Sequence, residues 1–189
     1  METSKQPAQP KMRTEIGKEV GTFTVGLAKE GERSAVVLGA ARLDVSLEHL
    51  LKAILCHNPG GDDNLFDVER PIGSFSAKTA LAYRLGLIDP EMEHALQMVR
   101  KIRNSFAHST DVATLANSPH KDRVEELAKV AIKSSHWLGL NDQVEKLISN
   151  PTLAKFATAV TVMLIIIETI ATLSEHSHPR VVASFSLNL

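Results

Sequence analysis

A six-residue segment in the middle of the chain brings together side chains suited to acid–base chemistry on a phosphate. It reads RNSFAH, from Arg103 to His108. Histidine gives and takes a proton near neutral pH, while arginine stays charged and binds a phosphate or a developing oxyanion. The amide of Asn104 can orient either partner by hydrogen bonds. Such a set could cleave RNA without a metal, by activating the ribose 2′-hydroxyl against the adjacent phosphate.

Each chain contributes a single His108 to this segment, whereas the cleavage uses both a general acid and a general base. A two-fold dimer would supply two histidines. The competing interpretation places His108 at the end of a helix, where a histidine interacts favourably with the macrodipole and catalyses nothing. Composition alone favours this second interpretation, so the segment must be judged with the elements that position it.

The segment ends a helix that we predict over 90–108. The residues Asp-Pro-Glu at 89–91 are a typical helix start, because they place an N-cap, a first-turn proline and an acid near the positive helix end. At the helical period, Asn104 and His108 share the polar side, and Arg103 falls on the margin of the apolar stripe. That stripe consists of Met92, Ala95, Leu96, Val99, Ile102 and Phe106.

A charged side chain beside a core needs a partner, and a second predicted helix, over 34–55, offers two. Asp44 lies on the border of that helix's apolar face, about 70° from its centre, and Glu48 lies one turn further along. We expect Asp44, or in second place Glu48, to pair with Arg103 through two hydrogen bonds. Such a pair would either hold the guanidinium for chemistry or only join two helices.

Four other basic residues could extend the site into an RNA-binding rim: Lys78, Arg84, Arg100 and Lys101. Arg100 lies on the same side of the helix as His108. A solvated helix face is the simpler interpretation for Lys101.

The rest of the chain predicts further helices. Apolar periodicity and helix-end signals indicate helices over 74–85, 120–134, 141–149 and 150–174. We therefore expect an all-α bundle of about five helices, forming one domain over 33–175. Glycines interrupt 15–32, which we expect to be an irregular arm. Two tails, over 1–14 and 176–189, complete the chain.

The composition is that of an ordinary globular protein. The 189 residues are 43% hydrophobic and 23% charged, with a formal net charge of -1. These values exclude a disordered chain and a polytopic membrane protein, and they lack the global basic charge of a non-specific DNA binder. Cys56 is the only cysteine, which fits the cytoplasm. The longest uncharged apolar stretch, 156–167, is shorter than the roughly 20 residues that span a bilayer, so we expect a buried helix.

No pattern in the sequence indicates a cofactor. The remaining histidines show no zinc-site spacing to a second histidine or acid, so we expect no metal. Gly60-Gly61 lacks the lysine and the strand context of a phosphate-binding loop.

The segment 103–108 resembles the Arg-polar-(x)3-His signature of the HEPN superfamily, whose members are small helical-bundle domains. Many of them are metal-independent ribonucleases that act as dimers. A wider region, 33–110, resembles the MltR family, which is named for the mannitol operon repressor. The stretches that carry this second resemblance are RS (33–34), LD (43–44), LL (50–51), PIGSFSAK (71–78), LAYRLGLI (81–88) and IRNSFAHS (102–109).

The two resemblances imply different functions. The HEPN signature implies RNA cleavage at a dimer-interface site with Arg103, Asn104 and His108, in a toxin, defence or RNA-processing setting. The MltR name implies transcriptional regulation, which would act through a protein partner because the sequence contains no helix-turn-helix or zinc finger. We therefore expect a homodimeric RNA-binding protein with endoribonuclease chemistry and a regulatory or antitoxin partner. The alternative is a non-catalytic regulator of the MltR type.

Overall fold

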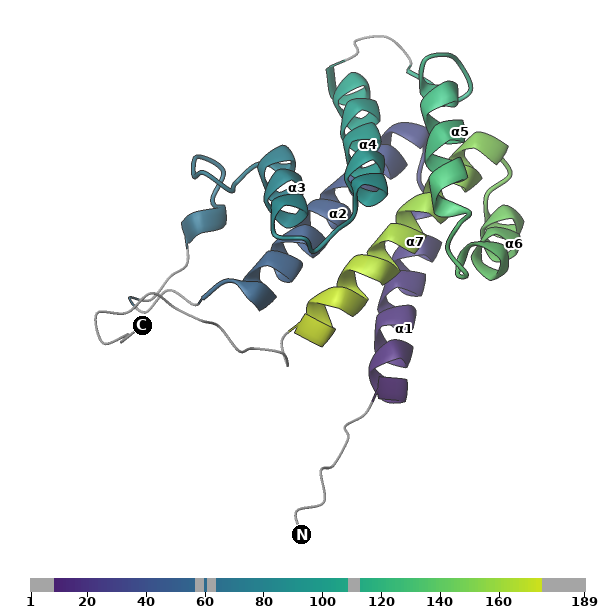
Figure 1. Ribbon diagram of the computed structural model, residues 1–189. Helices are drawn as coiled ribbons and strands as arrows, with labels where there is room; N and C mark the ends of the chain where they lie inside the picture. Colours follow the sequence, from purple (N-terminus) through teal and green to yellow (C-terminus); the bar gives the residue numbers. More distant parts are fainter. Residues whose placement is uncertain (1–8, 57–59, 61–63, 109–112, 175–189) are drawn as a thin grey trace, which may run out of the picture.

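The computed structural model describes residues 9–56, 60, 64–108 and 113–174, with side chains from residue 14 onward (Figure 1). All regular structure in these ranges is helical, so the all-α prediction is confirmed. The number of helices exceeds the predicted five or so. The elements are α1 (Gln9–Leu27), α2 (Glu32–Ile54), the short 3-10 helix η1 (Asn64–Phe66), α3 (Phe75–Arg84), α4 (Pro90–His108), α5 (His120–Ala131), α6 (Trp137–Leu147) and α7 (Pro151–Ser174).

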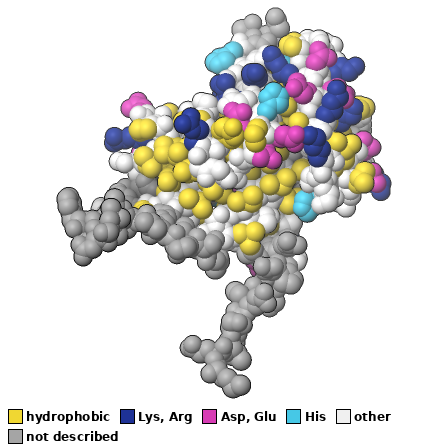
Figure 2. Space-filling model, in the orientation of Figure 1, with side chains coloured by type: hydrophobic (Ala, Val, Ile, Leu, Met, Phe, Trp, Pro, Cys, Tyr) yellow, Lys and Arg dark blue, Asp and Glu magenta, His cyan; other side chains and the backbone are white. Residues whose placement is uncertain are grey.

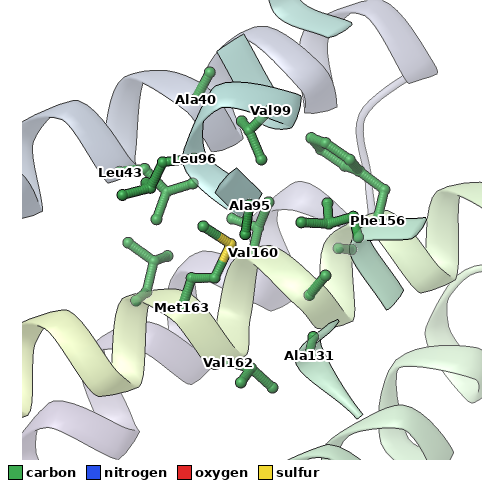
Figure 3. Close-up of a cluster of buried hydrophobic side chains, with 14 of the residues drawn as sticks. Ala40, Leu43, Ala95, Leu96, Val99, Ala131, Phe156, Val160, Val162 and Met163 are labelled. Carbon is green, nitrogen blue, oxygen red and sulfur yellow. The ribbon is translucent and has the colours of Figure 1, made fainter. Parts of the chain in front are cut away.

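Helix α7 lies at the centre of the bundle and packs against α1, α2, α5 and α6. Its residues between Leu153 and Leu164 are nearly all buried, because the helix is apolar around most of its circumference. Figure 3 shows Phe156, Val160 and Met163 in one cluster with side chains of α2 and α4. On the face drawn in Figure 2, hydrophobic side chains form a band along α7, and charged side chains crowd over α4 and α5.

Helix α7 is also long and apolar enough to cross a membrane, judged by length and composition alone. Within the described ranges it is the single helix that passes this test, and 61% of its most apolar window is buried inside the bundle. Such burial is typical of the core helix of a globular protein, which agrees with the predicted buried helix.

The prediction of an irregular arm over 15–32 is wrong, because α1 occupies most of it. A Cβ atom added at Gly17, Gly21 or Gly26 would meet nothing within 4 Å, so these glycines lie away from the packed face. The packed face carries Val20 and Leu27, both buried. Glycine costs about 1 kcal/mol in a helix interior, and burial against α7 outweighs that cost.

A buried hydrogen bond fixes α1 on α7. The hydroxyl oxygens of Thr24 and Thr161 lie 2.8 Å apart, and both side chains are buried. Because α1 begins at Gln9, it also replaces the second half of the tail that was expected over 1–14. The tail expected over 176–189 lies outside the described residues.

The predicted ends of the helices around the site are close to the observed ones. Asp89 caps α4, because its Oδ1 accepts the backbone N–H of Met92 at 2.7 Å. Ser74 caps α3 in the same way, with its Oγ 3.1 Å from the backbone nitrogen of Ala77. Gly86 follows α3 with a φ of 70°, a conformation that glycine adopts without a steric penalty. The short helix expected over 141–149 begins earlier, at Trp137.

One acidic side chain joins three parts of the chain near the start of α2. Glu32 accepts the side-chain amide of Asn150 at 2.6 Å on Oε1 and the backbone N–H of Leu115 at 2.6 Å on Oε2. Asn150 in turn caps α7 by accepting the backbone N–H of Leu153 at 3.1 Å. The connection that follows α4 is therefore anchored to the ends of α2 and α7.

Candidate functional site

A groove of about 390 Å³ runs between α2, the start of α3 and the second half of α4. We call it the α2–α4 groove. Its polar residues come from all three elements, and small apolar residues of α2 form one wall. The lining residues are Val37, Ala40, Ala41, Asp44, Gly73, Ser74, Phe75, Ser76, Arg100, Arg103 and Asn104.

The chain makes a close backbone approach at Gly73, just before α3 begins at the groove. A Cβ atom at that position would lie 2.0 Å from the carbonyl oxygen of Asp67, so only glycine fits. The chain then turns into α3 at its cap residue, Ser74. The groove is therefore bordered by the N-terminal end of a helix, which favours negative charge.

Arg103 lies on the surface of α4 and lines the groove. Its Nη1 donates a hydrogen bond to Oδ1 of Asn104 at 3.1 Å. Among the described residues no carboxylate forms an ion pair with Arg103. The prediction that Asp44 or Glu48 would pair with this guanidinium is therefore wrong, although Asp44 does line the same groove.

Lys78 takes the two carboxylates instead. Its Nζ lies 2.8 Å from Oε2 of Glu48 and 3.2 Å from Oδ1 of Asp44. Burial raises the pKa of Glu48, but hydrogen bonds from Lys52 and Lys78 outweigh it and hold this pKa below its usual value. The helical wheel of α4 alone could not show this pairing, because the lysine that contacts the two carboxylates of α2 is carried by α3.

The predicted basic rim divides into buried, groove-lining and outlying residues. Lys78 is only 3% exposed and paired, so its assignment to an RNA-binding surface is wrong. Arg100 lines the groove beside Arg103, and its Nε donates to Oε1 of Gln97 at 2.8 Å. Lys101 and Arg84 are exposed but do not line the groove. Arg100 is thus the member of the rim that joins the site.

His108 is the last residue of α4 and is exposed. It does not line the α2–α4 groove, whereas Asn104, one turn earlier on the same side of the helix, does. Within one chain the structure therefore brings together Arg100, Arg103, Asn104 and Asp44. His108 lies beyond them, at the end of the helix.

A histidine that the sequence did not single out supports this end of α4. His120, the first residue of α5, is buried, and its Nε2 lies 3.3 Å from Oγ of Ser105. Its ring packs 5.0 Å from that of Phe106, and its Nδ1 is buried without a hydrogen-bond partner. Burial, with a smaller contribution from Arg123, lowers the pKa of His120 below its ordinary value. The sequence feature that could have singled out His120 is its position at the start of a predicted helix.

The arrangement is suited to binding an anion. Two guanidinium groups and a side-chain amide line one groove, next to the N-terminal end of α3 and its serine hydroxyls. The half-buried ring of Phe75 lies in the same groove and could stack on a base. In the part of the chain that the structure describes, no three histidine, cysteine, aspartate or glutamate side chains group as a metal site would need.

Comparison of this chain with protein-family models, with curated proteins and with solved structures finds no match. The chemistry of the groove is therefore the basis for a functional proposal.

Proposed function

We propose that this chain is an RNA-binding protein of the HEPN type that holds a phosphodiester in the α2–α4 groove. The observation that carries the proposal is the convergence of Arg100, Arg103 and Asn104 on one groove at the N-terminal end of α3. Arginine binds phosphate with a planar set of donors, and an adjacent helix start adds to the attraction. The net charge of -1 means that binding depends on this local site and not on a broad basic surface.

The arginines have donors left for a ligand. Arg100 uses Nε for Gln97, and Arg103 uses Nη1 for Asn104. Their other nitrogens have no partner among the described residues, so a phosphate would not have to displace an existing ion pair. This distinguishes them from cations that are already paired with carboxylates.

RNA cleavage would add His108 to this binding site. The 2′-oxygen of the ribose attacks the adjacent phosphorus, the bond to the 5′-oxygen breaks, and a 2′,3′-cyclic phosphate and a 5′-hydroxyl result. One histidine takes the proton of the 2′-hydroxyl and a second gives a proton to the leaving oxygen. A cytoplasmic homodimer, in which two α4 helices meet at their ends, would supply both from His108. Arg103 would stabilise the charge that develops on the phosphate.

Cleavage of end-labelled single-stranded RNA in EDTA tests this proposal. We expect the parent protein to cut the RNA, and the His108→Ala variant to bind it without cutting. Lys101→Ala is the matched control, because Lys101 is an exposed cation on the same helix outside the groove; it should cut like the parent. RNA that neither binds nor is cut by the parent protein would overturn the proposal.

An apolar hollow favours a second function, that of a non-catalytic regulator of the MltR type. The hollow, of about 390 Å³, lies between α7 and the turn that joins α3 to α4, and its walls include Leu87, Met92, Ile166 and Ile170. A contiguous apolar surface suits a protein contact, such as a regulatory or antitoxin partner. Replacing Ile170 with aspartate would weaken the binding of such a partner without changing RNA binding. Arg103→Ala would weaken RNA binding without changing the binding of the partner.

A further inference from the structure

Among the described residues, Asp44 has the only carboxylate that lines the α2–α4 groove, and the protein covers only part of this side chain. Its Oδ1 is buried and lies 3.2 Å from Nζ of Lys78, without the geometry of a hydrogen bond. The side chain as a whole is 33% exposed, so the exposure belongs to its other atoms. No hydrogen bond reaches this carboxylate from any residue that the structure describes. Oδ2 is therefore an acceptor that the groove offers to a ligand.

The position of this acceptor is fixed. Lys78, itself buried, lies between Asp44 and Glu48 and holds the Asp44 carboxylate on the wall formed by α2. The opposite side of the groove carries donors, from Arg100, Arg103 and the amide of Asn104. A ligand that fits this pattern has an anionic group for the donors and, next to it, a hydroxyl or N–H group for the carboxylate.

RNA has this pattern at every nucleotide, because a ribose 2′-hydroxyl adjoins each phosphate. DNA lacks the hydroxyl, and its phosphate would bring only negative charge toward Asp44. We propose that Asp44 accepts a hydrogen bond from the ribose 2′-hydroxyl next to the phosphate that binds Arg100 and Arg103, in the complex that forms before His108 takes this proton. Asp44 is then a specificity-determining residue that selects RNA over DNA. This inference rests on the proposed function, because it deepens the ligand class of the same groove.

Changing the 2′-position of the probe tests the inference without changing any residue of the α2–α4 groove. Three oligonucleotides of one sequence serve as probes: RNA, 2′-O-methyl RNA and DNA. Fluorescence anisotropy in EDTA, with the His108→Ala protein, measures binding while the RNA stays intact. A hydrogen bond to a charged acceptor contributes enough for roughly a tenfold preference or more. We expect RNA to bind that much more tightly than the other two probes, since 2′-O-methyl RNA keeps the oxygen but cannot donate.

Two variants in the same background separate selection from phosphate binding. Asp44→Ala should lose the preference while DNA binds as well as before or better, because a negative charge has been removed. Lys78 keeps Glu48 as its partner in this variant, and thermal melting followed by circular dichroism verifies that it is folded. Arg100→Ala is the matched control. It should weaken RNA and DNA equally, so the preference remains.

The outcomes distinguish the inference from the proposed function. Equal binding of RNA, 2′-O-methyl RNA and DNA would overturn the role of Asp44 while RNA binding stands. A preference that survives in folded Asp44→Ala protein would overturn it as well. Absence of binding to every probe would instead remove the proposed function and the inference together.

Discussion

Two clusters of charged side chains lie on different sides of helix α2, and they differ in how many of their cations have a carboxylate partner. Toward α1 and α7, Glu168 accepts the hydroxyl of Ser46 at 2.6 Å and lies 3.4 Å from Nη2 of Arg42. Arg42 is also paired with Glu19 at 2.5 Å. Toward α3 and α4, the arginines of the groove have no carboxylate partner among the described residues. The first cluster is closed and the second is open.

The difference teaches which charges are available for a ligand. A cation that already has carboxylate partners must give them up before it binds an anion, and that cost opposes binding. Among the described residues, Arg103 gives up at most one hydrogen bond, to the uncharged amide of Asn104. We therefore expect the closed pairs to contribute to the stability of the bundle and the open cations to bind a ligand. Each prediction below removes one group and measures both properties.

The largest effect on stability is expected at Lys78. Lys78→Met should lower the free energy of unfolding by about 3 kcal/mol, because it leaves Asp44 and Glu48 in a partly buried site without their shared cation. Urea denaturation measures the loss. Lys52→Met is the control: Lys52 is an exposed partner of Glu48, and its removal should cost less than about 1 kcal/mol. Equal losses in the two variants would show that burial of Lys78 matters little.

The second-largest effect is expected on RNA cleavage, with the free energy of unfolding nearly unchanged. Arg103→Ala should reduce RNA cleavage about 100-fold, the typical loss for one donor to a developing oxyanion. Its free energy of unfolding should change by less than about 0.5 kcal/mol, because Arg103 is exposed and no carboxylate is left unpaired. Cleavage assays and urea denaturation are run on the same preparation. A parallel loss of stability would mean that Arg103 belongs to a closed pair after all.

In the closed cluster we expect a smaller effect, which changes stability and not RNA affinity. Arg42→Ala should lower the free energy of unfolding by about 1 kcal/mol, since Arg42 joins Glu19 of α1 to Glu168 of α7. RNA affinity, measured by anisotropy, should not change. A drop in RNA affinity would show that the two clusters on α2 are coupled.

The smallest effect is a pH dependence that arises from His120. Its pKa is lowered from the ordinary 6.5 in the folded protein, so the unfolded chain takes up the proton first as the pH falls. Stability should therefore decrease on acidification below pH 6.5, before the loss associated with Glu48, whose ordinary pKa is 4.5. His120→Asn should flatten the first part of this curve.

Local patterns were enough to predict the elements that are fixed by local chemistry. The start of α4 at Pro90 follows from the capping aspartate before it, and the burial of α7 follows from its apolar sequence. Helix α1 was missed because its glycines argue against a helix, while the packing that stabilises it comes from α7, far away in the sequence. A rule based on neighbouring residues cannot include that contribution.

The candidate site shows the same limit. The types of Arg103, Asn104 and His108 suggested phosphate chemistry, and the structure brings the first two into one groove. The partner of Asp44 could not be predicted, because the competition between Lys78 and Arg103 depends on how α3 packs on α2. The role of His120 is likewise set by the approach of α5 to the end of α4.

The bond between Thr24 and Thr161 spans 137 positions of the sequence. Helix α1 precedes α7 in the chain, so it is synthesised before its docking surface, at roughly 5–20 residues per second. A glycine-rich helix of this length has little stability in water by itself. We therefore expect α1 to remain unfolded during synthesis until α7 supplies its docking surface, and to be exposed to chaperones and proteases until then.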